Sequence, residues 1–276
     1  MPGQKRVWNM AHRGGAGLSP ENTIYAFSRS INIYGADIIE MDVWLSSDGH
    51  PVVIHDPSVA RTTNGSGKIY RMPLREIKNL DAAFYFTTDG GGTYPLRGTG
   101  ITVPTLREVF ESLSGVRMNI EIQQVWPAME SQVYNMIVEY GMEELVTVAA
   151  KDHLVHKRFR SINKAGIATS ASIKQGTVFS ILSEIGLSKL YHPDIKAFQL
   201  PEKIKGSQVV TPKLIKAAHE QGIEVHVWII NDTNDMKKLI GMGIDGIITD
   251  FPDRLSSILK YQTGDSHEYN KNLEKI

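Results

Sequence analysis

Side chains that can carry acid–base and metal chemistry are concentrated in a short N-terminal block of the sequence. His12, Arg13 and His55 share this block with Glu40 and Asp42, two carboxylates separated by one residue. Each of the five ends or interrupts an apolar run that is typical of a strand, so the ionisable groups are directed at one place. This combination indicates a site that cleaves a phosphodiester.

The carboxylates indicate a hard divalent cation. In an extended strand Glu40 and Asp42 point to the same face because side chains alternate, and Glu121 interrupts the apolar run 119–122 in a similar way. Neighbouring carboxylates repel each other unless a cation, a shared proton or a basic neighbour balances them. Oxygen ligands without cysteine favour Mg²⁺ or Ca²⁺ over zinc. We expect Glu40, Asp42 and Glu121 to bind one such cation; ion pairs with barrel lysines or arginines are the alternative.

Two histidines and one arginine supply the other functions that such a site needs. His12 and His55 can donate or accept a proton near neutrality, since the reference pKa of imidazole is about 6.5. The planar guanidinium of Arg13 suits phosphate oxygens, and an ion pair with one of the carboxylates is compatible with that function. The glycine-rich run 14–17 lacks the Gly-Lys-Ser/Thr of a Walker loop and predicts a tight turn instead.

Short apolar runs that alternate with helical patterns must position these side chains. The expected strands are residues 7–11, 38–43, 118–122, 146–150, 167–172, 197–200, 225–230 and 246–249, with a hairpin partner at 51–55. Eight such alternations in a chain of 276 residues favour an α/β fold, a closed TIM (β/α)8 barrel. Catalytic residues of such barrels lie at the carboxyl ends of the strands. His12, Glu40, Asp42 and Glu121 lie at or near these ends, so we expect them to converge.

Two helices have clear start signals. Residues 20–34 are expected to begin with Ser19 as the N-cap and Pro20 at the first helical position. Residues 211–220 repeat this arrangement with Thr211 and Pro212. Proline is favoured at this position because its missing N–H has no helical partner there.

Composition limits the class of protein. The chain has 41% hydrophobic and 22% charged residues, and 30 basic and 30 acidic side chains give a formal net charge of +0. This balance argues against a nucleic-acid partner, and the absence of cysteine excludes disulfides and cysteine-based zinc sites. The sequence shows no apolar run long enough for a signal peptide or a membrane helix. We expect one domain over residues 1–276, with an insertion at about 56–104, in a cytoplasmic protein without stable membrane insertion; secretion is the alternative if a signal peptide precedes the given sequence.

The order of the motifs resembles the glycerophosphodiester phosphodiesterase family. The matching segments are His12-Arg13-Gly14, Pro20-Glu21-Asn22-Thr23, Glu40-Met41-Asp42, His55-Asp56, Pro104–Glu108, Asn119–Ile122, Ala217–His219, Val225–Trp228 and Asp245–Asp250. One such motif is weak support, but the ordered set spans nearly the whole chain. The resemblance implies metal-dependent hydrolysis of a small-molecule glycerophosphodiester to glycerol 3-phosphate and an alcohol, as part of lipid and glycerol metabolism.

The resemblance also implies roles for individual residues. One histidine removes the proton from the attacking oxygen and the other protonates the departing alcohol; we assign His12 as base and His55 as acid, and the reverse assignment stays open. The cation and Arg13 supply positive charge. After Asn-Ile-Glu-Ile the family usually has a lysine, but this chain has Gln123, which lacks the charge and should weaken anion binding. Lys151 is the candidate replacement.

Aromatic side chains are expected to contact the substrate. The segment 82–103 is rich in aromatic residues and glycine, so we expect it to lie over the barrel mouth and to set specificity. Phe84 within it would contact the substrate or, as the simpler alternative, close the core. Trp228, at the end of the seventh expected strand, would pack against the glycerol or the leaving group.

Two further functions fit the same scaffold. The first is a lysophospholipase D, which needs an open apolar groove, and the neutral chain argues mildly against it. The second is a barrel that binds phosphodiesters without turnover, and the retention of both histidines and all three carboxylates argues against it. The leaving alcohol, the choice between Mg²⁺ and Ca²⁺ and the oligomeric state stay open at this point.

Overall fold

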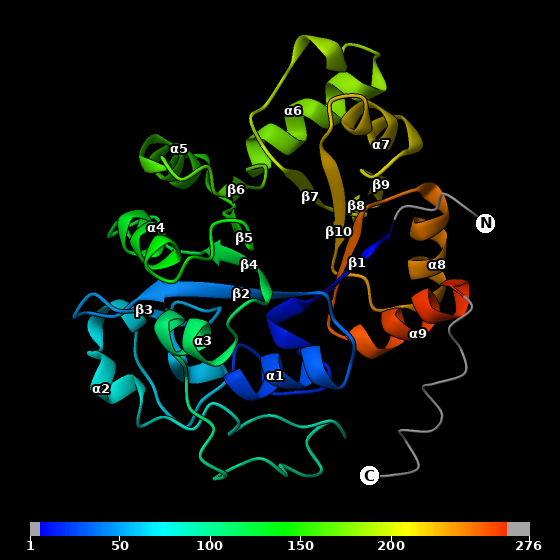
Figure 1. Cartoon of the computed structure of the whole chain (residues 1–276). Coiled ribbons are helices and arrows are strands. Elements are labelled where there is room, and N and C mark those ends of the chain that lie inside the picture. Colours follow the sequence, from blue (N-terminus) through cyan, green and yellow to red (C-terminus); the bar gives the residue numbers. More distant parts are fainter. Residues whose placement is uncertain (1–5, 264–276) are drawn as a thin grey trace.

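Eight parallel strands form the nearly closed barrel that the alternating pattern predicts (Figure 1). The computed structural model describes residues 6–263. In spatial order the strands are β6 (Ala168–Thr169), β5 (Val146–Ala149), β4 (Arg117–Ile122), β2 (Ile38–Leu45), β1 (Trp8–Ala11), β11 (Gly246–Thr249), β10 (Glu224–Trp228) and β7 (Ala197–Pro201). A parallel bridge between Ser170 and Ala197 links β6 to β7. We call this weakly paired junction the β6–β7 seam.

Helices surround the barrel (Figure 1). They are α1 (Ile24–Asn32), α3 (Leu106–Ser112), α4 (Glu130–Glu139), α5 (His153–Ile162), α6 (Ile173–Glu184), α7 (Pro212–His219), α8 (Thr233–Met242) and α9 (Pro252–Thr263). Thr105 and Ser172 form capping boxes at the starts of α3 and α6. Thr211 caps α7 and Pro212 follows it, so the prediction for this helix is confirmed.

Side chains on the strands alternate between an apolar face toward the helices and a polar face toward the barrel interior. Along β2, Ile39, Met41 and Val43 are fully buried in an apolar cluster. Glu40 and Asp42 lie between them in the chain and point the other way. A second apolar cluster packs β7, β10 and β11 against the helices that follow β6. The outer layer thus holds the strands while their inner face is free to carry chemistry.

The predicted start of the first helix is wrong. Helix α1 begins at Ile24, and its N-cap is Thr23, whose Oγ1 accepts a hydrogen bond from the N–H of Ala26. Residues 20–22 form a turn instead, in which Asn22 adopts a positive φ of 57°. This backbone conformation lies outside the helical region and turns the Asn22 side chain toward Asp42. A contact with the site therefore overrides the local helical signal.

Between β2 and α3 the chain leaves the barrel. Strand β3 (Pro51–Val53) pairs antiparallel with β2, and the short helices η2 (Val59–Arg61), η3 (Ile69–Arg71) and α2 (Leu74–Ile77) follow. These elements enclose a small apolar cluster of their own. Within the described residues, none of the helices has the length and apolar character needed to cross a bilayer.

Candidate active site

The turn after β1 places His12 and Arg13 at the mouth of the barrel. This turn, η1 (His12–Gly14), has positive φ values at Arg13 (49°) and Gly14 (80°). A Cβ on Gly14 would lie 2.6 Å from the ring of Phe27, so both the conformation and the space require glycine. The tight turn lets the N–H of Arg13 donate to Glu40 Oε2 at 2.8 Å. The first motif is thereby fixed against the first carboxylate.

The three predicted metal ligands converge. Glu40, Asp42 and Glu121 each offer an oxygen atom, and these atoms lie within 4.8 Å of one another. Glu40 and Asp42 are almost completely buried. Burial, together with the charges of Asp42 and Glu121, raises the pKa of Glu40 well above its usual value. Burial and the charge of Asp42 also raise the pKa of Glu121. The three candidate ligand atoms are all carboxylate oxygens, so a hard divalent cation fits the donor set.

Polar side chains hold Asp42 in place. Asn22 Nδ2 donates to Asp42 Oδ2 at 3.0 Å, and the N–H of Asp42 donates back to Asn22 Oδ1 at 3.2 Å. Gln123 Nε2 donates to the other carboxylate oxygen. Arg13 Nε lies 3.2 Å from Asp42 Oδ2 in an ion pair. Gln123, at the position where a lysine was expected, is therefore engaged with a carboxylate and supplies no charge of its own.

Each histidine is backed by an aspartate. His12 Nδ1 lies 2.7 Å from Asp250 Oδ1, and Asn231 Nδ2 donates to Asp250 Oδ2 at 2.7 Å. His55 Nδ1 lies 2.7 Å from Asp56 Oδ1. An aspartate on Nδ1 fixes the ring orientation and leaves Nε2 for a reacting group. Burial acts to raise the pKa of Asp250, but hydrogen bonds from His12 and Asn231 outweigh it and the pKa is lowered.

An arginine from the excursion after β3 connects the two halves of the site. Arg61 donates from both Nη atoms to the carboxylate of Glu21, at 2.8 and 2.7 Å, and from Nε to Asp56 Oδ2. Glu21 also accepts from Arg13 Nη1 at 3.0 Å. Burial opposes these contacts, but they lower the pKa of both Glu21 and Asp56. One chain of ion pairs thus runs from the backing of His55 to Arg13.

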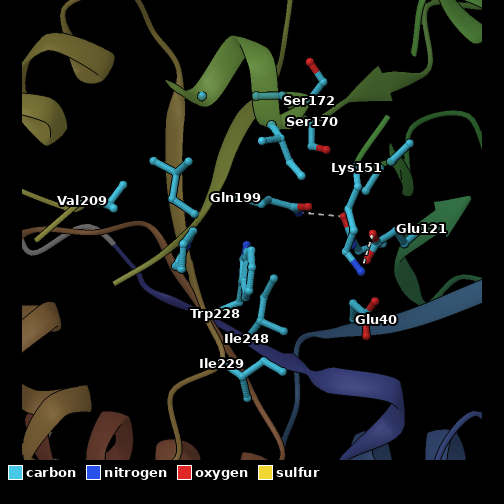
Figure 2. Close-up of a pocket in the computed structure, with 18 of the residues that line it drawn as sticks. Glu40, Glu121, Lys151, Ser170, Ser172, Gln199, Val209, Trp228, Ile229 and Ile248 are labelled. Atoms are coloured by element: carbon cyan, nitrogen blue, oxygen red, sulfur yellow. Dashed lines mark hydrogen bonds and ion pairs between the residues drawn. The ribbon is translucent and has the colours of Figure 1, made fainter. Parts of the chain in front are cut away.

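A cavity of about 710 Å³ opens on these groups (Figure 2). Eight of the residues predicted to form the site line it, namely His12, Arg13, Glu40, Asp42, His55, Glu121, Lys151 and Trp228. Lys151 Nζ lies 3.6 Å from Glu121 Oε1. The structure therefore brings most of the predicted residues to one space.

Two predicted substrate contacts do not line the cavity. Gln123 lies behind Asp42, as described above. Phe84 packs edge-on against Tyr85, with ring centroids 4.9 Å apart, and the guanidinium of Arg97 lies 4.3 Å from the centroid of its ring. The described cavity wall contains no residue from 82–103. Phe84 thus contacts other side chains of the segment 82–103 and not the wall of the cavity.

The wall opposite the carboxylates is apolar and comes from the β6–β7 seam. Ile173, Thr177 and Ile181 of α6 line one side, and Leu200 at the end of β7 faces them. A Cβ on Gly176 would lie 2.9 Å from Leu200, so this glycine lets α6 approach β7 closely. Figure 2 shows Glu40, Glu121 and Lys151 on one side of the cavity and Val209, Trp228 and Ile229 on the other.

Comparison with known proteins identifies the family. The model of the glycerophosphoryl diester phosphodiesterase family matches residues 12–254. The chain belongs to this family. It is 35% identical over 258 residues to a glycerophosphodiester phosphodiesterase from Caldanaerobacter subterraneus subsp. tengcongensis, covering 91% of this chain and 97% of the relative. It is 34% identical to a glycerophosphodiester phosphodiesterase from Bacillus altitudinis, covering 90% of this chain and 96% of the relative.

A solved structure agrees with the family and the barrel. A phosphodiesterase from Oleispira antarctica, in complex with the product sn-glycerol-3-phosphate, matches with a TM-score of 0.69 at 25% identity and covers 91% of this chain and 96% of that chain. The sequence reasoning on this phosphodiesterase-family chain missed Asp250, Asp56 and Arg61 as supports of the histidines. Asp56 and Asp250 belong to the motifs His55-Asp56 and Asp245–Asp250, and a carboxylate directly after an expected strand was the available signal.

The raised pKa of Glu40 predicts how the stability of the metal-free phosphodiesterase depends on pH. The folded-state pKa of Glu40 lies above the ordinary value of 4.5, so the folded chain binds this proton more tightly than the unfolded chain does. This binding stabilises the fold fully at pH values below 4.5, and the contribution is lost as the pH rises through the folded-state pKa. In chelator, the unfolding free energy of the wild type should therefore fall relative to Glu40→Gln, by up to about 1.4 kcal/mol per pH unit. Denaturant titrations between mildly acidic and neutral pH measure this difference, and parallel curves for the two proteins would contradict it.

Proposed function

We propose that this protein hydrolyses glycerophosphodiesters to glycerol 3-phosphate and an alcohol. The observation that carries the proposal is the convergence of three carboxylates and two aspartate-backed histidines on one cavity. Membership of the phosphodiesterase family and the similarity to a product-bound phosphodiesterase support the same reaction. The cytoplasmic location and the single-domain organisation stay predictions.

Glu40, Asp42 and Glu121 would hold one divalent cation, Mg²⁺ or Ca²⁺. Their oxygen-only donor set and the raised pKa of Glu40 are what support this assignment. A cation bound there would neutralise phosphate charge as it builds up during the reaction. Arg13 lines the cavity beside the same carboxylates and would face a phosphate oxygen.

The two histidines would move the protons. His12 is proposed to accept the proton of the attacking oxygen, and His55 to give its proton to the oxygen of the departing alcohol. A new bond forms between the attacking oxygen and phosphorus, and the bond between phosphorus and the alcohol oxygen breaks. In the net reaction, water supplies the oxygen gained by the phosphate and the proton gained by the alcohol. Asp250 and Asp56 would stabilise the imidazolium form of each ring.

Removal of the cation tests the metal site. Chelation should abolish turnover of glycerophosphocholine, and adding back Mg²⁺ or Ca²⁺ should restore it, because phosphate charge is otherwise unbalanced. Glu121→Gln, which keeps the shape but loses the charge, should raise the cation concentration needed for half-maximal activity about tenfold or more. Full activity of either the chelated wild type or Glu121→Ala would remove the cation from the mechanism.

A substrate with a good leaving group separates the two histidines. A nitrophenolate needs no proton to leave, so His55→Ala should be impaired on glycerophosphocholine and much less so on a nitrophenyl analogue. His12→Ala should be impaired on both, because the attacking oxygen must still lose its proton. Each loss is expected to be on the order of 10² to 10⁴ in kcat. Rescue confined to His12→Ala would reverse the assignment, and equal losses on both substrates would reject any division of roles.

A second substrate class is favoured by the apolar wall of the cavity. The cavity also has apolar side chains that a glycerol and a small head group do not need for recognition, namely Ile173, Ile181, Leu200 and Ile204. An acyl chain would remove these surfaces from water. We therefore propose that lysophospholipids are also accepted, which is lysophospholipase D chemistry on the same phosphorus atom.

A charge in the apolar wall tests this second class. Ile181→Asp should lower kcat/KM for lysophosphatidylcholine relative to glycerophosphocholine by about tenfold or more, because an acyl chain would have to desolvate the carboxylate. Ile181→Leu is the matched control and should keep the wild-type ratio. The second class fails if Ile181→Asp leaves the ratio unchanged or if the wild type has no activity on the lysolipid.

A further inference from the structure

Helix α6 exposes an apolar stripe to solvent. Ile173, Thr177, Ile181 and Ile185 follow one another at intervals of four residues and therefore share one face of the helix and its C-cap. Ile173 is 64% exposed, Ile181 58% and Ile185 61%. Helices on a protein surface normally turn a polar face outward. Ile173, Ile181 and Ile185 belong to none of the apolar clusters of the described residues, so the stripe calls for another explanation.

The stripe is continuous with the catalytic cavity. Ile173, Thr177 and Ile181 also line the cavity, so the apolar surface begins inside it and runs outward. The hairpin of β8 (Lys203–Ile204) and β9 (Ser207–Gln208) also borders the cavity, because Ile204 lines it and is half exposed. Beyond the end of α6, Leu187 and Leu190 are also exposed. We call the side chains of Ile173, Ile181, Ile185, Leu187, Leu190 and Ile204 the apolar rim.

Exposed lysines accompany the apolar rim. Lys174 and Lys189 lie beside the stripe, and Lys203 and Lys205 flank Ile204 in the hairpin. Both carboxylates of the same segments are paired with lysines outside the rim. Glu184 pairs with Lys213 at 3.6 Å. Glu202 pairs with Lys238 at 2.8 Å and, over a longer distance of 3.8 Å, with Lys203 of the hairpin. Apolar side chains interspersed with lysines favour a surface that is both apolar and anionic.

We propose that the apolar rim docks on the surface of an anionic phospholipid bilayer. A bilayer accepts the isoleucine and leucine side chains into its interfacial region and pairs the lysines with lipid phosphates. A chain that leaves such a surface would reach the cavity along apolar side chains without crossing water. A second copy of the protein on the same face would cover the opening instead. The docking goes beyond the proposed hydrolysis, because it requires no turnover.

Vesicle flotation with the full-length protein tests the docking. The wild type should float with vesicles of phosphatidylcholine mixed with phosphatidylglycerol, and added salt should weaken this binding. Ile185→Ser/Leu190→Ser, at two rim positions outside the cavity, should lower the partition coefficient about tenfold or more. Lys174→Gln/Lys189→Gln should lower binding to the mixed vesicles toward the level seen with pure phosphatidylcholine.

A matched control separates the rim from general surface apolarity. Ile33→Ser/Val138→Ser removes two exposed aliphatic side chains, one at the C-cap of α1 and one in α4, on the other half of the barrel, and should bind as the wild type does. Both serine pairs should hydrolyse soluble glycerophosphocholine at the wild-type rate, which shows that fold and site are intact. Flotation of the rim variant equal to that of the wild type would overturn the docking. So would a wild type that does not float but forms, by light scattering, a dimer that the rim variant loses.

Discussion

The convergence of three carboxylates, two of them buried, at one end of the barrel is the constraint on which the site depends. Glu40 and Asp42 reach the interior because they alternate with apolar residues that β2 buries against the helices. Burial and mutual repulsion raise the pKa of Glu40, so the cluster is costly without a compensating charge. Its neighbours are arranged to reduce that cost. The N–H of Arg13 faces Glu40, and the amide of Asn22 faces Asp42.

Positive charge reaches the site through a chain of ion pairs rather than through a single basic side chain. Arg13 lies between Asp42 and Glu21, and Glu21 is shared with Arg61. Arg61 also contacts the aspartate behind His55, so the excursion after β3 takes part in positioning an acid–base group. A change at Arg61 would remove a charged partner from both Glu21 and Asp56 at once. The excursion therefore matters to the chemistry even though its aromatic part lies outside the described cavity wall.

Local patterns predicted most of the barrel and the carboxylate cluster. Strand positions follow from apolar runs, and the convergence of Glu40, Asp42 and Glu121 follows from their places at strand ends. The prediction for the start of α1 was wrong because Asn22 is held by Asp42. This contact joins residues that are distant in the sequence, so no local signal records it. The contact between Arg61 and Glu21 joins residues 40 positions apart and was missed for the same reason. Phe84 does not line the described cavity, and an aromatic residue beside glycines is equally typical of a segment that packs on itself.

The least regular part of the barrel lies beside the apolar half of the cavity. At the β6–β7 seam a single β-bridge replaces a full ladder of backbone hydrogen bonds, and α6 packs closely against β7 at Gly176. Weak pairing there leaves space between α6 and the strand ends, and apolar side chains line that space. The polar half of the cavity is fixed by ion pairs and cannot vary without loss of charge balance. The apolar half carries no such restriction. If lysolipids are substrates as proposed, we expect changes in α6 and the β8–β9 hairpin to alter which alcohol or acyl group is accepted while the reacting groups keep their geometry.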